Sequence, residues 1–134
     1  MDLVQFLRDR LDEDEAPARA ALGVNVLASM KRGKPAPRWV PSPDGEAGIW
    51  DTNGIPRVKF VWARERDHII RHDPARVLAE VEAKRQAVDH YEQVRTLTKD
   101  HEAYILAESA VLRQIQYMAL PYADHPDYRQ EWRP

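Results

Sequence analysis

The sequence predicts an α+β fold that is mostly α-helical. It should contain two long helices in an antiparallel hairpin, an N-terminal helix packed against them, and a small β-hairpin. First, apolar residues recur at helical spacing in both the N-terminal and the C-terminal part. Second, five of the ten prolines lie between residues 34 and 63, where apolar and charged residues alternate as in strands. Third, the pair Asp73-Pro74 is typical of the start of a long helix.

Length and composition are those of a single soluble domain. The chain has 134 residues, of which 43% are hydrophobic and 31% charged, and its formal net charge is −2. The lack of cysteine excludes disulfide bonds, thiol catalysis and cysteine-based zinc sites. No apolar run approaches the roughly 18 residues of a membrane span, and the N-terminus carries acids and arginines where a secretory leader is apolar. We expect one cytoplasmic domain, residues 1–134, without membrane contact.

The first segment, residues 1–33, is predicted to be helical. Asp2 followed by Gln5 is typical of a helix start with a capping side chain. Four apolar residues then mark one helical face: Leu3, Phe6, Leu7 and Leu11. Pro17 would either kink this helix or lie in the first turn of a second one. Helical spacing continues after it and is expected to stop at Gly33.

The second segment, residues 34–63, is predicted to form the β-hairpin and its loops. Asn53-Gly54 is a strong turn signal between two short strands, one around Ile49-Trp50 and one in the run 57–62. In the second strand, three apolar residues occupy alternate positions: Val58, Phe60 and Trp62. Because this is the period of a half-buried strand, we expect their side chains to share the buried face.

The third segment, residues 64–120, is predicted to be the helical hairpin. Asp67 is expected to cap a short helix that ends at the Asp-Pro pair. Asp73 at the cap and Pro74 at the first helical position then open the first long helix. Both are therefore assigned a structural role.

The last helix and the tail complete the predicted fold. The turn before this helix falls near residues 96–103, with Thr98 or Asp100 as its cap. Residues 121–134 read as an irregular tail. Three aromatic residues could anchor that tail on the core: Tyr122, Tyr128 and Trp132.

Three blocks of the sequence resemble a family of small proteins from actinobacteria and their phages. The blocks are DLVQFLRDRLDEDEAPARAA at the N-terminus, HIIRHDPARVLAEVEAKR at residues 68–85, and ALPYADHPDYRQEW near the C-terminus. The segment of roughly residues 23–62 carries no part of the resemblance. The family is a domain of unknown function. The resemblance therefore implies an actinobacterial or phage source and a cytoplasmic accessory role, but no activity and no catalytic residues.

Two histidines four residues apart form a candidate metal site. On a helix, His68 and His72 would present two imidazoles to one metal ion, with His125 of the tail as a third ligand. Ile69 stands where a metalloprotease helix carries its catalytic glutamate, so the pair does not predict a protease. The preferred alternative is that His72 lies at a helix end, where an imidazolium interacts well with the carbonyl dipoles. No cofactor is predicted.

A basic and aromatic segment at residues 31–66 is a candidate nucleic-acid surface. Its net charge is +4, against −3 for the residues before it and −3 for those after it. Basic side chains contact phosphates, and aromatic faces stack on unpaired bases. The candidate contacts are Arg38, Trp39, Arg57, Lys59, Trp62 and Arg64. The alternative is that the aromatic residues cover the β-hairpin and the charges form its solvated face.

No catalytic constellation accompanies these features. Ser42 and Ser109 lack the sequence context of a nucleophile, and no phosphate-binding loop is present. The sequence therefore favours a small non-enzymatic accessory protein that binds or regulates a protein partner, and it is compatible with a homo-oligomer. A nucleic-acid-binding protein built on residues 31–66 is the first alternative. A metal-dependent enzyme built on His68, His72 and the tail is the second.

Overall fold

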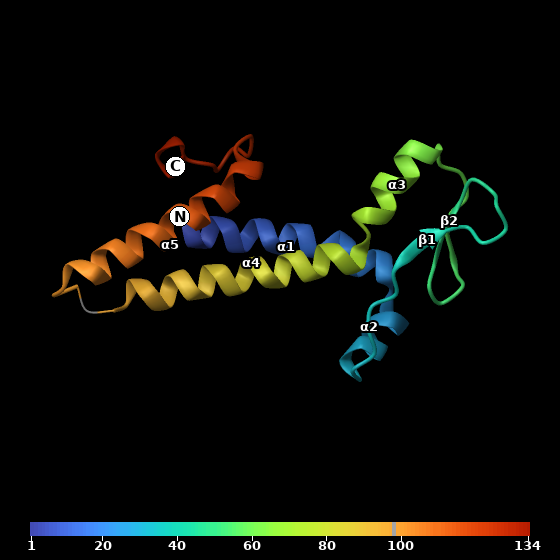
Figure 1. Cartoon of the computed structure of the whole chain (residues 1–134), viewed down its shortest axis with the longest axis horizontal. Coiled ribbons are helices and arrows are strands. Elements are labelled where there is room, and N and C mark those ends of the chain that lie inside the picture. The colour runs from blue at the N-terminus through green and yellow to red at the C-terminus, as the bar shows by residue number, and fades with distance from the viewer. Residues whose placement is uncertain (98) are drawn as a thin grey trace. The chain divides into compact units, whose positions relative to one another are not determined.

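The computed structural model describes residues 1–97 and 99–134, and this part of the chain is α+β and mostly α-helical, as predicted (Figure 1). Its α-helices are α1 (Leu3–Leu22), α2 (Val24–Lys31), α3 (Ala63–Arg71), α4 (Pro74–Arg95) and α5 (Glu102–Ala119). Its strands are β1 (Trp39–Pro41), β2 (Ile49–Asp51) and β3 (Pro56–Val58), and the tail holds two 3-10 turns, η1 (Leu120–Tyr122) and η2 (Gln130–Trp132). Within the described residues, every helix is too short or too polar to cross a membrane.

The chain divides into two compact units, and α1 and α4 each contribute to both. Unit 1 comprises residues 1–13 and 81–134, and unit 2 comprises residues 14–80. Unit 1 therefore contains the start of α1, the end of α4, all of α5 and the tail. Unit 2 contains the remaining parts of α1 and α4 together with α2, the sheet and α3. The basic and aromatic segment of residues 31–66 belongs entirely to unit 2.

The core of unit 1 is built around Phe6, which is fully buried on α1. Its ring lies 5.8 Å from that of Tyr128 and 5.0 Å from that of Trp132, between centroids. The helices α4 and α5 supply further core residues: Val88, Tyr91, Ile115 and Ala119. Burial of a large apolar side chain stabilises a fold by roughly 1.5–3 kcal/mol. The tail aromatics therefore do anchor the C-terminus on the first helix, as predicted.

α1 starts as predicted and runs without a break through Pro17. The backbone N–H of Gln5 donates to the Asp2 carboxylate at 2.8 Å, which caps the first turn. The expected continuation beyond Leu22 is interrupted, because Gly23 adopts a φ of 86°. Glycine takes this left-handed conformation without steric cost, so the chain turns there and α2 begins anew.

The sheet of unit 2 has one strand more than the predicted hairpin, in the antiparallel order β1-β2-β3. β3 ends at Val58, and Phe60 and Trp62 lie beyond it with exposed side chains. The prediction that these two aromatic residues face inward on a strand is wrong. The alternation of faces does not extend to them because the strand stops at Val58, and the pairing of β2 with β3 is itself irregular, with a register shift between Ile49 and Trp50.

Asp73 opens α4 as predicted and also ties that helix to the sheet. It is fully buried, and its Oδ1 accepts the N–H of Arg76 at 2.9 Å, the bond expected of a helix cap. Pro74 takes the first helical position. The other oxygen, Oδ2, accepts the Nε–H of Arg38 at 2.7 Å and the backbone N–H of Trp39 at 3.0 Å. One carboxylate thus holds the start of α4 against the start of β1.

The prediction that Asp67 caps the short helix is wrong. α3 begins four residues earlier, at Ala63, and Trp62 takes the N-cap position without a side-chain hydrogen bond. The acid in its first turn is Glu65, whose charge suits the positive end of the helix dipole. The sequence signal fails here because this helix starts without a capping side chain.

The cap of α5 also differs from the predicted one. The His101 ring accepts the backbone N–H of Ala103 at 3.1 Å and satisfies the first turn of the helix. Asp100 therefore does not fill this role, and Thr98, the other residue proposed for it, lies outside the described residues. An imidazole nitrogen is an acceptor like a carboxylate oxygen, so the chemistry of the cap is preserved in a less common residue.

Candidate interaction surface and pocket of unit 2

An exposed aromatic pair lies between β3 and α3. Phe60 is 60% exposed and Trp62 is 72% exposed. Their rings meet edge to face, with 5.2 Å between the centroids. Large aromatic side chains usually stabilise a fold by burial, so two of them in contact at the surface contribute little to folding and remain available for binding. We call Phe60 and Trp62 the aromatic pair.

The positive charges predicted around this pair divide into two groups. Arg57 donates to the buried carboxylate of Asp51 at 2.7 Å, and Arg38 is held in the same way by Asp73. Lys59 and Arg64 are exposed, and neither makes an ion pair within residues 1–97 and 99–134. Of the six predicted nucleic-acid contacts, Lys59, Trp62 and Arg64 are therefore exposed and without an ion pair among the described residues. Trp39 is half-buried in β1, and Arg38 and Arg57 are held by aspartates, although Arg38 is itself exposed.

The two histidines of α3 lie close together at its end. The rings of His68 and His72 have centroids 4.5 Å apart, and Nδ1 of His72 donates to the His68 carbonyl oxygen at 2.9 Å. His72 is the C-cap residue of α3, which agrees with the preferred interpretation of a helix boundary. Among the described residues, no three His, Cys, Asp or Glu side chains are grouped so that they could hold a metal ion.

His125, the third ligand considered, belongs to unit 1 and has other partners there. Its Nδ1 accepts from Nη1 of Arg10 at 3.0 Å and from the backbone N–H of Asp127 at 3.1 Å. Its ring also lies against Phe6, with 5.7 Å between the centroids. These contacts give His125 a structural role in the core of unit 1. The three-histidine metal site stays a prediction.

Ser42, considered above as a nucleophile, is bound to a neighbouring carboxylate. Its hydroxyl donates to Asp44 in the turn before β2. This hydrogen bond, together with the backbone N–H of Glu46 at 2.9 Å, lowers the pKa of the Asp44 carboxyl below its ordinary value. The contact fixes a turn, and the lowered pKa makes the Asp44 carboxylate a weak base for activating the Ser42 hydroxyl.

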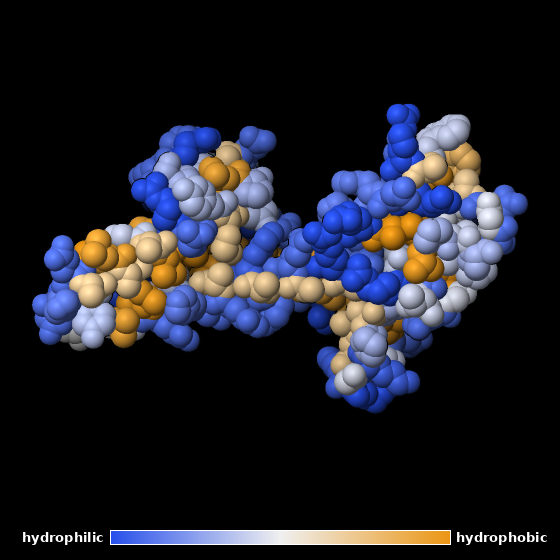
Figure 2. All heavy atoms as spheres, in the orientation of Figure 1, coloured by the Kyte–Doolittle hydropathy of each residue, from blue (hydrophilic) through white to orange (hydrophobic). Residues whose placement is uncertain are grey.

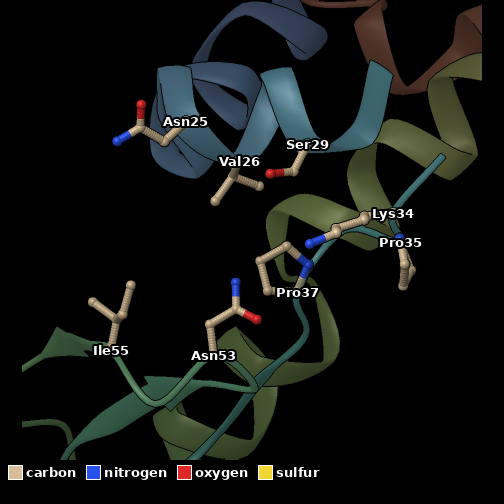
Figure 3. A pocket seen from close by; sticks show the side chains of 8 residues that line it. All are labelled: Asn25, Val26, Ser29, Lys34, Pro35, Pro37, Asn53 and Ile55. Atoms are coloured by element: carbon tan, nitrogen blue, oxygen red, sulfur yellow. The ribbon is translucent and has the colours of Figure 1, made fainter. Parts of the chain in front are cut away.

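A pocket of about 390 Å³ opens between α2, the proline-containing connection to β1, and the β2–β3 turn (Figure 3). It is lined by Asn25, Val26, Ser29, Lys34, Pro35, Pro37, Asn53 and Ile55. In Figure 3 the Ser29 hydroxyl, the Lys34 amine and the Asn53 amide point into the space. The side chains of Val26 and Ile55 approach it from opposite walls. Polar groups thus converge on a partly apolar pocket, the usual composition of a ligand site.

A second group of exposed apolar residues lies in unit 1, where α4 ends and α5 begins (Figure 2). It comprises Leu97, Tyr104, Ile105 and Leu106, each more than two-fifths exposed. Three of the four are aliphatic, whereas the exposed pair of unit 2 is aromatic. These two exposed groups therefore differ in chemistry.

A family model described as "Family of unknown function (DUF6221)" matches residues 1–134. The chain belongs to this family. The match covers the whole chain, so DUF6221 includes the central segment that the three sequence blocks left out. Neither a curated protein nor a solved structure matches the chain. DUF6221 membership therefore assigns no activity to the chain.

The pocket of this DUF6221 protein is the feature that the sequence did not reveal. Its walls come from three separate segments, and none of them carries a motif. The prolines at 35 and 37 and the Asn53-Gly54 turn were visible in the sequence, but only as signals for loops. Their meeting with α2 depends on the break at Gly23, which periodicity did not predict.

Proposed function

We propose that this DUF6221 protein is a non-enzymatic binding module and that the aromatic pair is its contact surface for a protein partner. The observation that carries the proposal is the exposure of Phe60 and Trp62 side by side. Covering roughly 100 Å² more of each ring would stabilise a complex by about 2–3 kcal/mol per ring before other costs. The binding energy of protein interfaces is concentrated in such residues, with tryptophan enriched and leucine under-represented. This favours the pair over the exposed group of unit 1, in which three of the four residues are aliphatic.

The charges beside the pair favour a protein over a nucleic acid. Glu65 lines the same shallow hollow as Trp62 and Arg64, so a carboxylate stands where a phosphate would approach. The positive charges of Arg38 and Arg57 are already compensated by buried aspartates. Mixed charge around an apolar centre is the usual composition of a protein interface with its polar rim.

Nucleic acid is the second candidate function, because the two exposed rings lie close in sequence to Lys59 and Arg64. Aromatic faces stack on unpaired bases, and neighbouring basic residues contact phosphates. The two candidates differ in a measurable way. Phosphate contacts weaken steeply as the salt concentration rises, whereas an interface centred on two aromatic rings changes little.

The experiment is a comparison of immobilised variants in an actinobacterial lysate, the source that the sequence resemblance implies. The test variant is Phe60→Ala/Trp62→Ala, and the matched control is Tyr104→Ala/Leu106→Ala, which removes two exposed apolar side chains from unit 1. We expect a protein that is retained by the wild type and the control, withstands nuclease and added salt, and is lost at least 10-fold on the test variant. Equal retention by all three contradicts the proposal. A ligand that nuclease removes assigns the surface to nucleic acid instead.

A further inference from the structure

We propose that the pocket of Figure 3 binds the C-terminal carboxylate of a peptide chain that ends in a branched aliphatic residue. The pocket shares no lining residue with the aromatic pair, so this is a second site of unit 2, independent of the proposed function. Its ligand is identified by two features of the lining, a convergent set of hydrogen-bond donors and a pair of aliphatic walls.

The donors fit a carboxylate. Lys34 brings a positive charge that forms no ion pair within the described part of the chain, and its amine points into the pocket. The Ser29 Oγ accepts a bond from Arg32 at 3.3 Å, so its own proton is free to donate inward. Asn53 adds an amide group. A carboxylate is acceptor-only, and hydrogen bonds from a charged donor to it are about twice as strong as neutral ones.

The remaining lining fits a branched aliphatic side chain. Val26 and Ile55 approach the space from opposite walls, and Pro37 adds a third apolar surface (Figure 3). A volume of about 390 Å³ lies near the lower end of the range for ligand pockets. It suits one or two residues of a chain rather than a large cofactor.

The wall formed by the β2–β3 turn is held in place before any ligand arrives. The buried Asp51 accepts the backbone N–H of Asn53 at 2.9 Å and that of Ile55 at 3.1 Å through Oδ1. Gly54 adopts a φ of 78°, which completes the turn between them. Because Asn53 and Ile55 are fixed in this way, binding loses little further conformational entropy.

The openness of the pocket favours a chain end over a free organic acid. Asn25, Lys34, Asn53 and Ile55 are exposed, so the walls do not close over a ligand. Sites for free small molecules usually bury most of the ligand surface. When the last residue of a peptide occupies an open pocket, the preceding residues can extend outward without a clash. They then gain contacts along the rim.

The test is a titration followed by amide NMR with three probes of the same aliphatic shape. They are acetyl-Gly-Ala-Leu with a free carboxylate, the same peptide as its C-terminal amide, and 4-methylpentanoate. We expect saturable shifts at Ser29, Lys34, Asn53 and Ile55 with the free peptide, and at least 10-fold weaker binding of the other two. Lys34→Gln should weaken the free peptide about 10-fold or more. The control Lys31→Gln, an exposed lysine at the end of α2 outside the pocket, should bind as the wild type does.

Each other outcome overturns the proposal at a defined step. Equal binding of the amide shows that the carboxylate is not recognised. Equal binding of 4-methylpentanoate makes the pocket a site for free acids. An absence of localised shifts removes the site, and because the spectrum of Lys34→Gln also reports its folding, a misfolded variant cannot imitate a loss of binding.

Discussion

The aromatic cluster around Phe6 in unit 1 and the aromatic pair of unit 2 are used in opposite ways. In unit 1, Phe6 contacts the rings of Tyr128 and Trp132, and all three are buried although the chain ends that carry them are far apart in sequence. In unit 2, Phe60 and Trp62 lie two residues apart and touch each other, and both are exposed. The first arrangement forms part of a hydrophobic core, whereas the second places two aromatic rings on the surface.

Polar contacts in the interior of unit 2 hold its elements together without the aromatic pair. Two fully or almost fully buried carboxylates, Asp51 and Asp73, each bind an arginine and the backbone of a turn or helix start. Hydrogen bonds to these charged groups fix the start of α4 and the β2–β3 turn without any contribution from the exposed rings. If the proposed function is correct, the buried rings of unit 1 serve stability and the exposed pair of unit 2 serves recognition. Substitutions in either unit test this division.

The largest effect is expected at Phe6. Phe6→Ala removes a fully buried ring that contacts four aromatic or histidine side chains, so we expect a loss of about 3–5 kcal/mol in the free energy of unfolding. Urea denaturation followed by circular dichroism measures it. A loss below about 1 kcal/mol would show that the tail does not pack on this ring.

A smaller loss is expected at Asp73. Asp73→Ala removes the cap of α4 and leaves the N–H of Trp39 without its acceptor, for a total of about 2–4 kcal/mol. The pair with Arg38 adds little because that side chain is more than half exposed. The same denaturation experiment checks the value, with Asp73→Asn as a control that keeps the shape and should lose less. Equal losses for the two variants would contradict the role given to the carboxylate.

The Ser42–Asp44 contact gives a pH-dependent effect without a large change in stability. The folded protein lowers the pKa of the Asp44 carboxyl, so the hydrogen bond stabilises the fold above the ordinary pKa of an aspartate. This stabilisation is lost as the pH falls through the lower pKa of the folded state. Carbon-detected NMR titration of Asp44 should place its pKa below 3.8, the ordinary value, and Ser42→Ala should move it back upward. An identical titration in both proteins would mean that the hydroxyl does not donate to this carboxylate.

The predicted helices show what local pattern can establish. The apolar spacing and the Asp73-Pro74 pair predicted α1, α4 and α5, because a helix buries one face and each turn repeats the same local choice. The start of α3 was misplaced, since it has no capping side chain to reveal it. Pro17 allowed two interpretations, and only the structure shows that the helix continues through it.

The candidate sites depended on contacts between distant residues. Lys59, Trp62 and Arg64 were chosen from composition, and the structure shows them exposed. Arg38 and Arg57 have the same composition signal but meet buried aspartates, a pairing that the sequence does not display. Whether an aromatic residue is buried likewise depends on where a strand ends, and β3 stops at Val58, before the aromatic pair.

The most direct test of the separation between stability and recognition is the free energy of unfolding of Phe60→Ala/Trp62→Ala, measured by urea denaturation beside the wild type. Because both rings are mostly exposed, we predict a difference within about 0.5 kcal/mol for each substitution, although two large aromatic side chains are removed. A loss of several kcal/mol, similar to that of Phe6→Ala, would show that the pair holds the fold together, and it would contradict its assignment as a free binding surface.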